Sequence, residues 1–439
     1  MISKTLITLI VVACVATAGV GVALYYFLDD GGQDLSYDER GRLMIFGNAN
    51  NDDYLDENDV EYLRAIIRGD VEPTPLADAN QDGAIDEEDI KMVQLIIEKQ
   101  NQIKDGKKPT KMEVFYLYPY AKEFYVGSIM YPLDKVAVVG TNVMITAKLV
   151  GATDKIVARH GGTVDTTLYS DLVSKPQISD DVFNADFERV TQLISQSGMF
   201  DAIITLDSIS YVSNYKQFEN IGVKVIRIAA SDGVESLAGA LTIGFMLGVN
   251  EGAQKYVEFA DSIFDILKER IDTIPMEDRV TTLSVTMTNS VSGLPSDYYG
   301  ATMLAGAINI ADWTTTTRTF NTLTSGDTWM YNQEYDSDFI IHVRSIGYGK
   351  IDSNAVWNQY SPNFANTPAA KNGNYVIING NMPVMIRTIY MAHIFYPELV
   401  TYDEIVELHQ FYIDNYVPNL AGYDVTTDGV FIIRGPTGP

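Results

Sequence analysis

Cysteine and histidine are scarce in this sequence, which has one cysteine and four histidines in 439 residues. Cys14 has no partner in the chain, so the fold must hold without an intramolecular disulfide. It lies in an apolar run near the N-terminus, which leaves no thiol elsewhere for nucleophilic catalysis. The motifs G-x-S-x-G and H-E-x-x-H and the Walker loop are also missing. We therefore predict a binding protein and not an enzyme, with a hydrolase that uses paired carboxylates as the alternative that remains open.

Basic residues are also few, with 31 Lys and Arg against 58 Asp and Glu and a net charge of −27. Such a chain repels polyanions, which argues against nucleic acid or an anionic membrane surface as its partner. Cations and neutral ligands fit this charge better. Apolar residues make up 46% of the chain and charged residues 20%, which is typical of a folded globular protein long enough for two or three domains.

The first 30 residues contain an apolar run without a charged residue, residues 5–28. Because about 20 apolar residues suffice to cross a bilayer, we predict that residues 1–30 form a transmembrane anchor. Lys4 before the run and Asp29 and Asp30 after it favour an extracellular position for the rest of the chain. A cleaved signal peptide is the alternative, although the run is long for one and no A-x-A site follows it. The predicted location is the cell surface, anchored to the cytoplasmic membrane.

The strongest local pattern is a repeat of a 12-residue loop with the calcium-ligand spacing of EF-hands, at residues 48–59 and 78–89. Calcium takes about six to eight oxygen ligands, so a tight loop must turn alternate side chains inward. Gly83 allows the sharp turn in the second loop, whereas Asp53 stands there in the first, which predicts weaker binding. We expect two Ca²⁺ sites. Their predicted ligands are Asn48, Asn50, Asp52, Tyr54, Asp56 and Asp59 in the first loop, and Asp78, Asn80, Asp82, Ala84, Asp86 and Asp89 in the second.

An amphipathic helix is predicted after each loop, over residues 60–67 and 90–97. With aspartate at loop position 12 and a helix on one side only, residues 43–100 resemble a type I dockerin. The resemblance implies a cohesin partner or docking onto a neighbouring domain of the same chain. Dockerins often carry small hydroxyl residues at loop positions 10 and 11, but this chain has Glu57-Asn58 and Glu87-Glu88. A cohesin partner and a purely structural, calcium-stabilised stalk therefore both remain open.

A polar linker, residues 101–110, precedes a large region in which short apolar runs alternate with helical patterns. This alternation predicts an α/β fold. We expect an N-terminal α/β lobe over residues 111–250, an inter-lobe helix over residues 251–273 and a C-terminal α/β lobe over residues 279–420. The expected strands, each followed by a helix in the first lobe, are 114–118, 136–139, 155–158, 202–205 and 223–228, and then 281–287, 339–343 and 375–378.

This order of elements resembles the helical-backbone (type III, cluster A) solute-binding proteins of ABC transporters. The likeness is carried by residues 135–142 and 154–157, by 200–205 with 218–225, and by 371–380 with 394–399. It implies two lobes joined by a long helix, and a ligand such as an iron-siderophore, haem or cobamide delivered to an ABC permease. Members of this class usually present a glutamate on each lobe to the permease. Residues 208–213 contain none, which argues against such docking.

In two-lobed α/β proteins the ligand lies outside the carboxyl ends of the strands. Thr141 and Asn142 follow one strand, where they could hold an anion or simply cap a helix. Arg159 and His160 follow the next strand and suit an anionic chelate or a metal, unless they are only part of a polar loop. Tyrosine and tryptophan rings suit flat ligands. The predicted ligand contacts are Tyr118, Tyr120, Thr141, Asn142, Arg159, His160, Tyr211, Tyr298, Tyr299, Trp313 and Tyr348.

These patterns predict a membrane-anchored extracellular protein that captures a metal chelate or tetrapyrrole for ABC import, with a calcium-binding, dockerin-like stalk. The alternative is a cell-surface scaffold or adhesion protein that uses a solute-binding fold and dockerin–cohesin assembly. A polysaccharide-active enzyme attached through the dockerin is the third hypothesis.

Overall fold

The computed structural model describes residues 43–120, 123–161, 165–206, 210–228, 235–286, 290–293, 296–311, 320–322 and 337–435. The predicted anchor lies outside these residues. Within the described ranges, no helix is both long and apolar enough to cross a bilayer.

The repeat folds into the pair of helices that its apolar spacing predicts, α3 (Glu57–Arg68) and α4 (Glu87–Lys104). Both begin with a capping box. The side chain of Asp56 or Asp86 caps the helix, and the aspartate three residues later returns a bond to the backbone N–H of the cap. α4 continues to Lys104, so the helix takes up the first part of the expected linker, and Ile103 packs against the main apolar core.

The N-terminal lobe is built on a five-stranded parallel sheet with the order β5-β4-β3-β6-β7. Its central strands are buried on both faces because helices flank the sheet, as a parallel sheet requires. The strands are β3 (Val136–Val139), β4 (Ile156–His160), β5 (Gln177–Ser179), β6 (Ala202–Leu206) and β7 (Lys224–Ile228). The helices are α5 (Thr141–Leu149), α6 (Ser170–Val173), α7 (Phe187–Ser197), α8 (Tyr215–Glu219) and α9 (Glu235–Met246).

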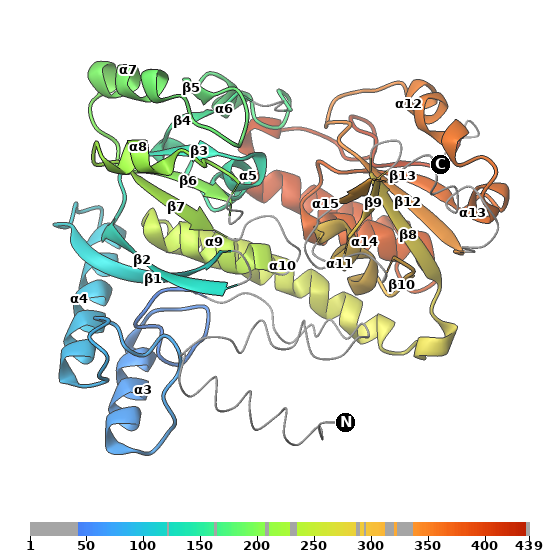
Figure 1. Cartoon of the computed structure of the whole chain (residues 1–439). Helices are drawn as coiled ribbons and strands as arrows, with labels where there is room; N and C mark the ends of the chain where they lie inside the picture. The colour runs from blue at the N-terminus through green and yellow to red at the C-terminus, as the bar shows by residue number, and fades with distance from the viewer. Residues whose placement is uncertain are drawn as a thin grey trace, which may run out of the picture.

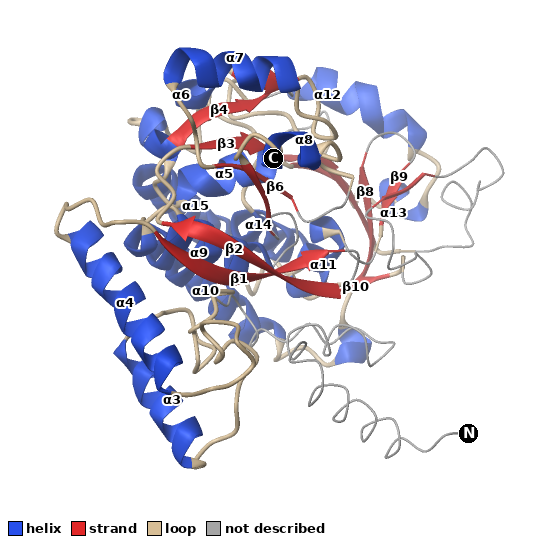
Figure 2. Cartoon of the chain, turned by 60° about the vertical axis from the view of Figure 1, so that its left-hand side comes forward, coloured by secondary structure: helices blue, strands red, loops and turns tan. Residues whose placement is uncertain are grey.

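The first expected strand does not belong to this sheet, and no helix follows it. β1 (Met112–Tyr120) pairs with β2 (Glu123–Tyr131), and the two form a separate antiparallel hairpin (Figure 2). Gly127 lies opposite Tyr116, whose ring occupies the space that a side chain would need, because a Cβ there would lie 2.6 Å from it. The helical expectation was wrong because residues 123–131 pair with β1 along their whole length.

The C-terminal lobe has its own seven-stranded sheet, in which β8, β12 and β13 are parallel. The strands are β8 (Thr281–Thr286), β9 (Ser290–Ser292), β10 (Ile308–Asn309), β11 (Phe320–Thr322), β12 (Phe339–Arg344), β13 (Tyr375–Asn379) and β14 (Ile432–Ile433). The helices are α11 (Asp297–Leu304), α12 (Ser353–Tyr360), α13 (Pro368–Lys371), α14 (Val384–Phe395) and α15 (Tyr402–Tyr416).

One long helix, α10 (Asn250–Ile271), runs between the two lobes as predicted (Figure 1). At its start Gly252 lies against α5, where a Cβ would come within 2.2 Å of the carbonyl oxygen of Val150. At its end Arg270 forms a bidentate ion pair with Glu404 of α15, with both N–O distances 2.6 Å. The two sheets share no strand, and α10 is fixed to both halves.

The repeat module (residues 43–100) is not a detached stalk. Ile45 forms a β-bridge with Tyr116 of the hairpin, and the backbone N–H of Phe46 donates to the carbonyl of Phe115 at 3.0 Å. A single buried apolar cluster extends from the module through α10 to α14. Because they share this core, the module and the lobes should unfold together.

Candidate functional site

The carboxyl ends of β3 and β4 bring the predicted residues Thr141 and His160 together. His160 is 2% exposed, and its Nδ1 accepts the backbone N–H of Gly140 at 3.3 Å, while its Nε2 lies 3.4 Å from the Thr141 hydroxyl. Burial, followed by the neighbouring charge of Arg159, lowers the pKa of His160 to about 4. The ring is therefore neutral at pH 7 and orders the start of α5. Asn142 lies half-buried beside it.

Arg159 has a structural role. Its guanidinium is buried and donates to the backbone carbonyls of Leu172 at 3.0 Å, His160 at 2.7 Å and Val173 at 2.9 Å. These bonds join the end of β4 to the end of α6. They use the side chain to satisfy buried carbonyls, so the expectation of a cation that faces a ligand is not supported.

In the C-terminal lobe, Tyr298 and Arg387 form a contact between the first turns of α11 and α14. The Arg387 guanidinium lies 4.7 Å from the centre of the partly exposed Tyr298 ring, a cation–π geometry. α14 follows the carboxyl end of β13, which is the edge of the sheet where ligands bind in this type of architecture. Arg387 carried no signal in the sequence because it lies within an apolar helix.

Several predicted aromatic contacts belong to the core or the hairpin instead. Tyr299 is buried, and Tyr348 is fully buried with its hydroxyl 3.0 Å from Nε2 of His409. Their roles as ligand contacts stay predictions. The Tyr118 ring lies at a tilt beside those of Tyr116 and Tyr125 in the hairpin, and Tyr211 stacks on Phe183. Trp313 and the side chain of Tyr120 lie outside the described residues.

The two lobes are joined directly on one side, which the sequence did not predict. The Asp165 carboxylate of the N-terminal lobe accepts the backbone N–H of Tyr348 in the other lobe at 2.8 Å. Asn419 donates across the same boundary to the carbonyls of Thr167 at 2.9 Å and Leu168 at 2.8 Å. These bonds limit how far the lobes can separate.

Most hydrogen bonds within the first predicted calcium loop have an equivalent within the second. Asp59 and Asp89 are buried, and each carboxylate accepts two backbone N–H groups of its own loop. Burial raises the pKa of Asp59 to about 7 and also raises the pKa of Asp89. Among the described residues, no group of three or more His, Cys, Asp or Glu side chains has the arrangement of a metal site. The predicted ligand sets depend in part on asparagine and backbone oxygens.

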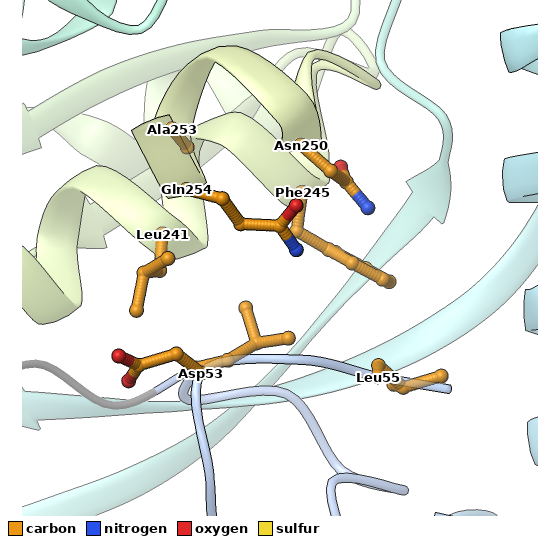
Figure 3. Close-up of a pocket in the computed structure, with 8 residues that line it drawn as sticks. Asp53, Leu55, Leu241, Phe245, Asn250, Ala253 and Gln254 are labelled. Carbon is orange, nitrogen blue, oxygen red and sulfur yellow. The ribbon is translucent and has the colours of Figure 1, made fainter. Parts of the chain in front are cut away.

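A small cavity lies between the module and the lobes, not between the two lobes (Figure 3). Its volume of about 10 Å³ leaves room for about one water molecule, too little for a solute. It is lined by Leu43, Asp53, Leu55, Leu241, Phe245, Asn250, Ala253 and Gln254.

No protein-family model and no curated protein matches this sequence. Solved structures of solute-binding proteins do match its fold. A periplasmic solute-binding protein of Veillonella parvula is 18% identical with a TM-score of 0.51, covering 71% of this chain and 94% of its own. The molybdate-binding protein MolA of Haemophilus influenzae is 16% identical with a TM-score of 0.54, covering 67% and 95%. The TroA-like protein FepB of V. parvula is 15% identical with a TM-score of 0.53, covering 70% and 97%.

The described chain therefore has the two-lobed α/β fold of the type III periplasmic solute-binding proteins.

Proposed function

We propose that this protein is an extracellular solute receptor that captures a metal chelate or a tetrapyrrole between its lobes for ABC import. The observation that carries the proposal is the pair of separate sheets fixed to one helix, α10. The similar protein MolA was solved with molybdate, and a similar Helicobacter pylori protein, CeuE, with a nickel–histidine complex. These are bound metal species, which supports a chelate as the ligand class. Anchoring by residues 5–28 would keep the receptor at the cell surface.

The contacts available at the two edges suit a large, partly aromatic ligand. The N-terminal lobe offers the Thr141 hydroxyl and the side chain of Asn142, which are both half-buried, and the buried His160 ring positions Thr141. The C-terminal lobe offers the Tyr298 ring, which is held by Arg387. A flat ring with a polar tip can stack on a macrocycle or catecholate and bond to its edge.

The test is calorimetric titration of the purified full chain with haem, cobalamin, a ferric catecholate and molybdate. We expect saturable one-to-one binding of at least one of them. Asn142→Arg, at the start of α5, should weaken that binding at least tenfold by filling the space between the lobes. Ser195→Arg on the exposed side of α7 is the matched control and should bind normally. The proposal fails if none of the four ligands binds, or if both variants behave alike.

We further propose that the module binds calcium, with the second loop as the stronger site. The repeated loop spacing and the two buried carboxylates, Asp59 and Asp89, support this. A metal that binds only the folded state stabilises it, so chelation should lower the melting temperature of the whole chain, because the module and the lobes share a core.

A second candidate function, assembly with a cohesin, is favoured by one observation. Ile67 and Leu95 on α3 and α4 are 40% and 49% exposed. In this proposal the two exposed apolar side chains contact the partner. Retention of this chain on an immobilised cohesin, lost on Leu95→Lys, would support this function, and failure to be retained would contradict it.

A further inference from the structure

The two loops of the repeat have different surroundings. In the second loop Asp82, Gly83 and Asp86 are exposed to solvent. In the first loop the equivalent positions are half-buried, and Leu55 is fully buried where Ile85 is only partly so. The first loop faces α9 of the N-terminal lobe and the inter-lobe helix α10 (Figure 3).

The chemistry at loop position 1 also differs. Asp78 accepts backbone N–H groups with both carboxylate oxygens, from Asp82 at 3.3 Å and Gly83 at 3.0 Å. Asn48 accepts only from Asp52, at 3.2 Å. Its Nδ2 faces two carbonyl oxygens, those of Leu43 at 2.8 Å and Asp52 at 2.6 Å.

Carbonyl oxygens only accept hydrogen bonds, so the atom that faces them must be the NH₂ group. Asn48 thus offers a donor where the second loop has an anionic oxygen, and the first loop has one negative charge fewer at this position. The side chain is 0% exposed and connects the loop to the segment that pairs with the hairpin.

Loop position 6 differs in backbone as well as in side chain. Gly83 has φ of +91°, in the left-handed region that calcium loops use for their sharp turn. Asp53 is not among the residues with positive φ. Asp53 instead lines the cavity that residues of α9 and α10 close from the other side (Figure 3). The missing glycine therefore does not strain the first loop, which follows a different path towards α10.

One direct hydrogen bond and a two-bond bridge through Gln100 of α4 join the first loop to α10. The Tyr54 hydroxyl donates to the Glu258 carboxylate at 2.9 Å. Gln100 of α4 donates to the carbonyl of Leu55 at 3.2 Å and accepts from Asn250, the first residue of α10, at 2.8 Å. At the equivalent position of the second loop, Ala84 has no hydroxyl that could make the bond of Tyr54.

We propose that the two loops have divided their tasks: the second loop takes a single Ca²⁺, and the first is a docking loop that holds the module against α10 without a metal. This inference rests on the calcium proposal above and replaces the expected two sites by one. The recognised partner of the first loop is the N-terminal half of the inter-lobe helix.

The stoichiometry can be measured by native mass spectrometry and calorimetry of the full chain with Ca²⁺ alone. We expect one ion per chain. The matched substitutions are Asp82→Asn and Asp52→Asn at the same loop position, of which only the first should abolish binding. Two ions, with one lost in Asp52→Asn, would overturn the inference and leave the calcium proposal standing. No bound ion in the wild-type chain would overturn both.

Hydrogen exchange tests the docking role separately. When Ca²⁺ is removed by EDTA, the amides of residues 78–89 should exchange at least tenfold faster, while those of residues 48–59 should keep the protection seen in α10. Equal loss of protection in both loops on chelation would overturn the inference, because the first loop would then depend on metal and not on its contacts with α10.

Discussion

His409 of α15 should make the stability of this protein depend on pH. The imidazole is 0% exposed, and its two nitrogens lie 3.0 Å and 3.1 Å from the hydroxyls of Tyr348 and Tyr390. Burial lowers the pKa of His409 from 6.5 to about 3. Between these two values the unfolded chain binds more protons than the folded chain, so stability falls as the pH falls. Above pH 6.5 the imidazole is neutral in both states, so this loss of stability is absent there.

The magnitude follows from about 1.4 kcal/mol per pKa unit. Between pH 6.5 and 4.5 this group alone should remove about 2 kcal/mol of unfolding free energy. His409→Gln keeps an amide that can bond to both hydroxyls but cannot ionise. Urea unfolding of the two proteins at several pH values should show a shallower acid dependence in the variant. Parallel curves for the two proteins would refute the reasoning, because His409 would then not be neutral and buried.

Three further perturbations test the packing. Gly252→Ala should lower the melting temperature by several degrees, since the new Cβ would meet the carbonyl oxygen of Val150. Gly300→Ala, in open space within α11, should raise stability by about 0.5–1 kcal/mol. Equal effects of the two substitutions in calorimetry would contradict this reasoning. Asp165→Ala should increase the spread of inter-lobe distances measured by spin labels, and an unchanged distribution would exclude its role in joining the lobes. Arg270→Lys should cost about 1–3 kcal/mol in chemical denaturation through loss of the bidentate pair, with no change if that pair is absent in solution.

Much of the fold could be predicted from the periodicity of apolar residues and from the order of the expected elements along the chain. The 30-residue offset between the loops and the alternation of apolar runs with helical patterns are local signals, and they located both helices of the module, the main strands and α10. The hairpin was misassigned because its partner strand, β2, had no turn signal before it. Short strands such as Gln177–Ser179 and Ile432–Ile433 depend on pairing with distant residues, so no local pattern marks them.

The site was harder to predict than the fold. The sequence could place Thr141 near His160 because each follows a strand of the same sheet, and parallel strands end at one edge. Arg159 and Tyr348 have the same residue chemistry as ligand contacts but point into the protein. The bond from Asp165 to the other lobe joins residues 183 positions apart, and the docking of the module depends on similarly distant pairs. Such contacts become visible only when the chain is folded.

The central claim is that a solute is held between the two lobes. Hydrogen exchange with and without the ligand identified by titration tests it most directly. We predict slower exchange in two separate segments at once, residues 140–143 at the start of α5 and residues 296–299 at the start of α11. Protection confined to one lobe, or found only in the module, would contradict the claim.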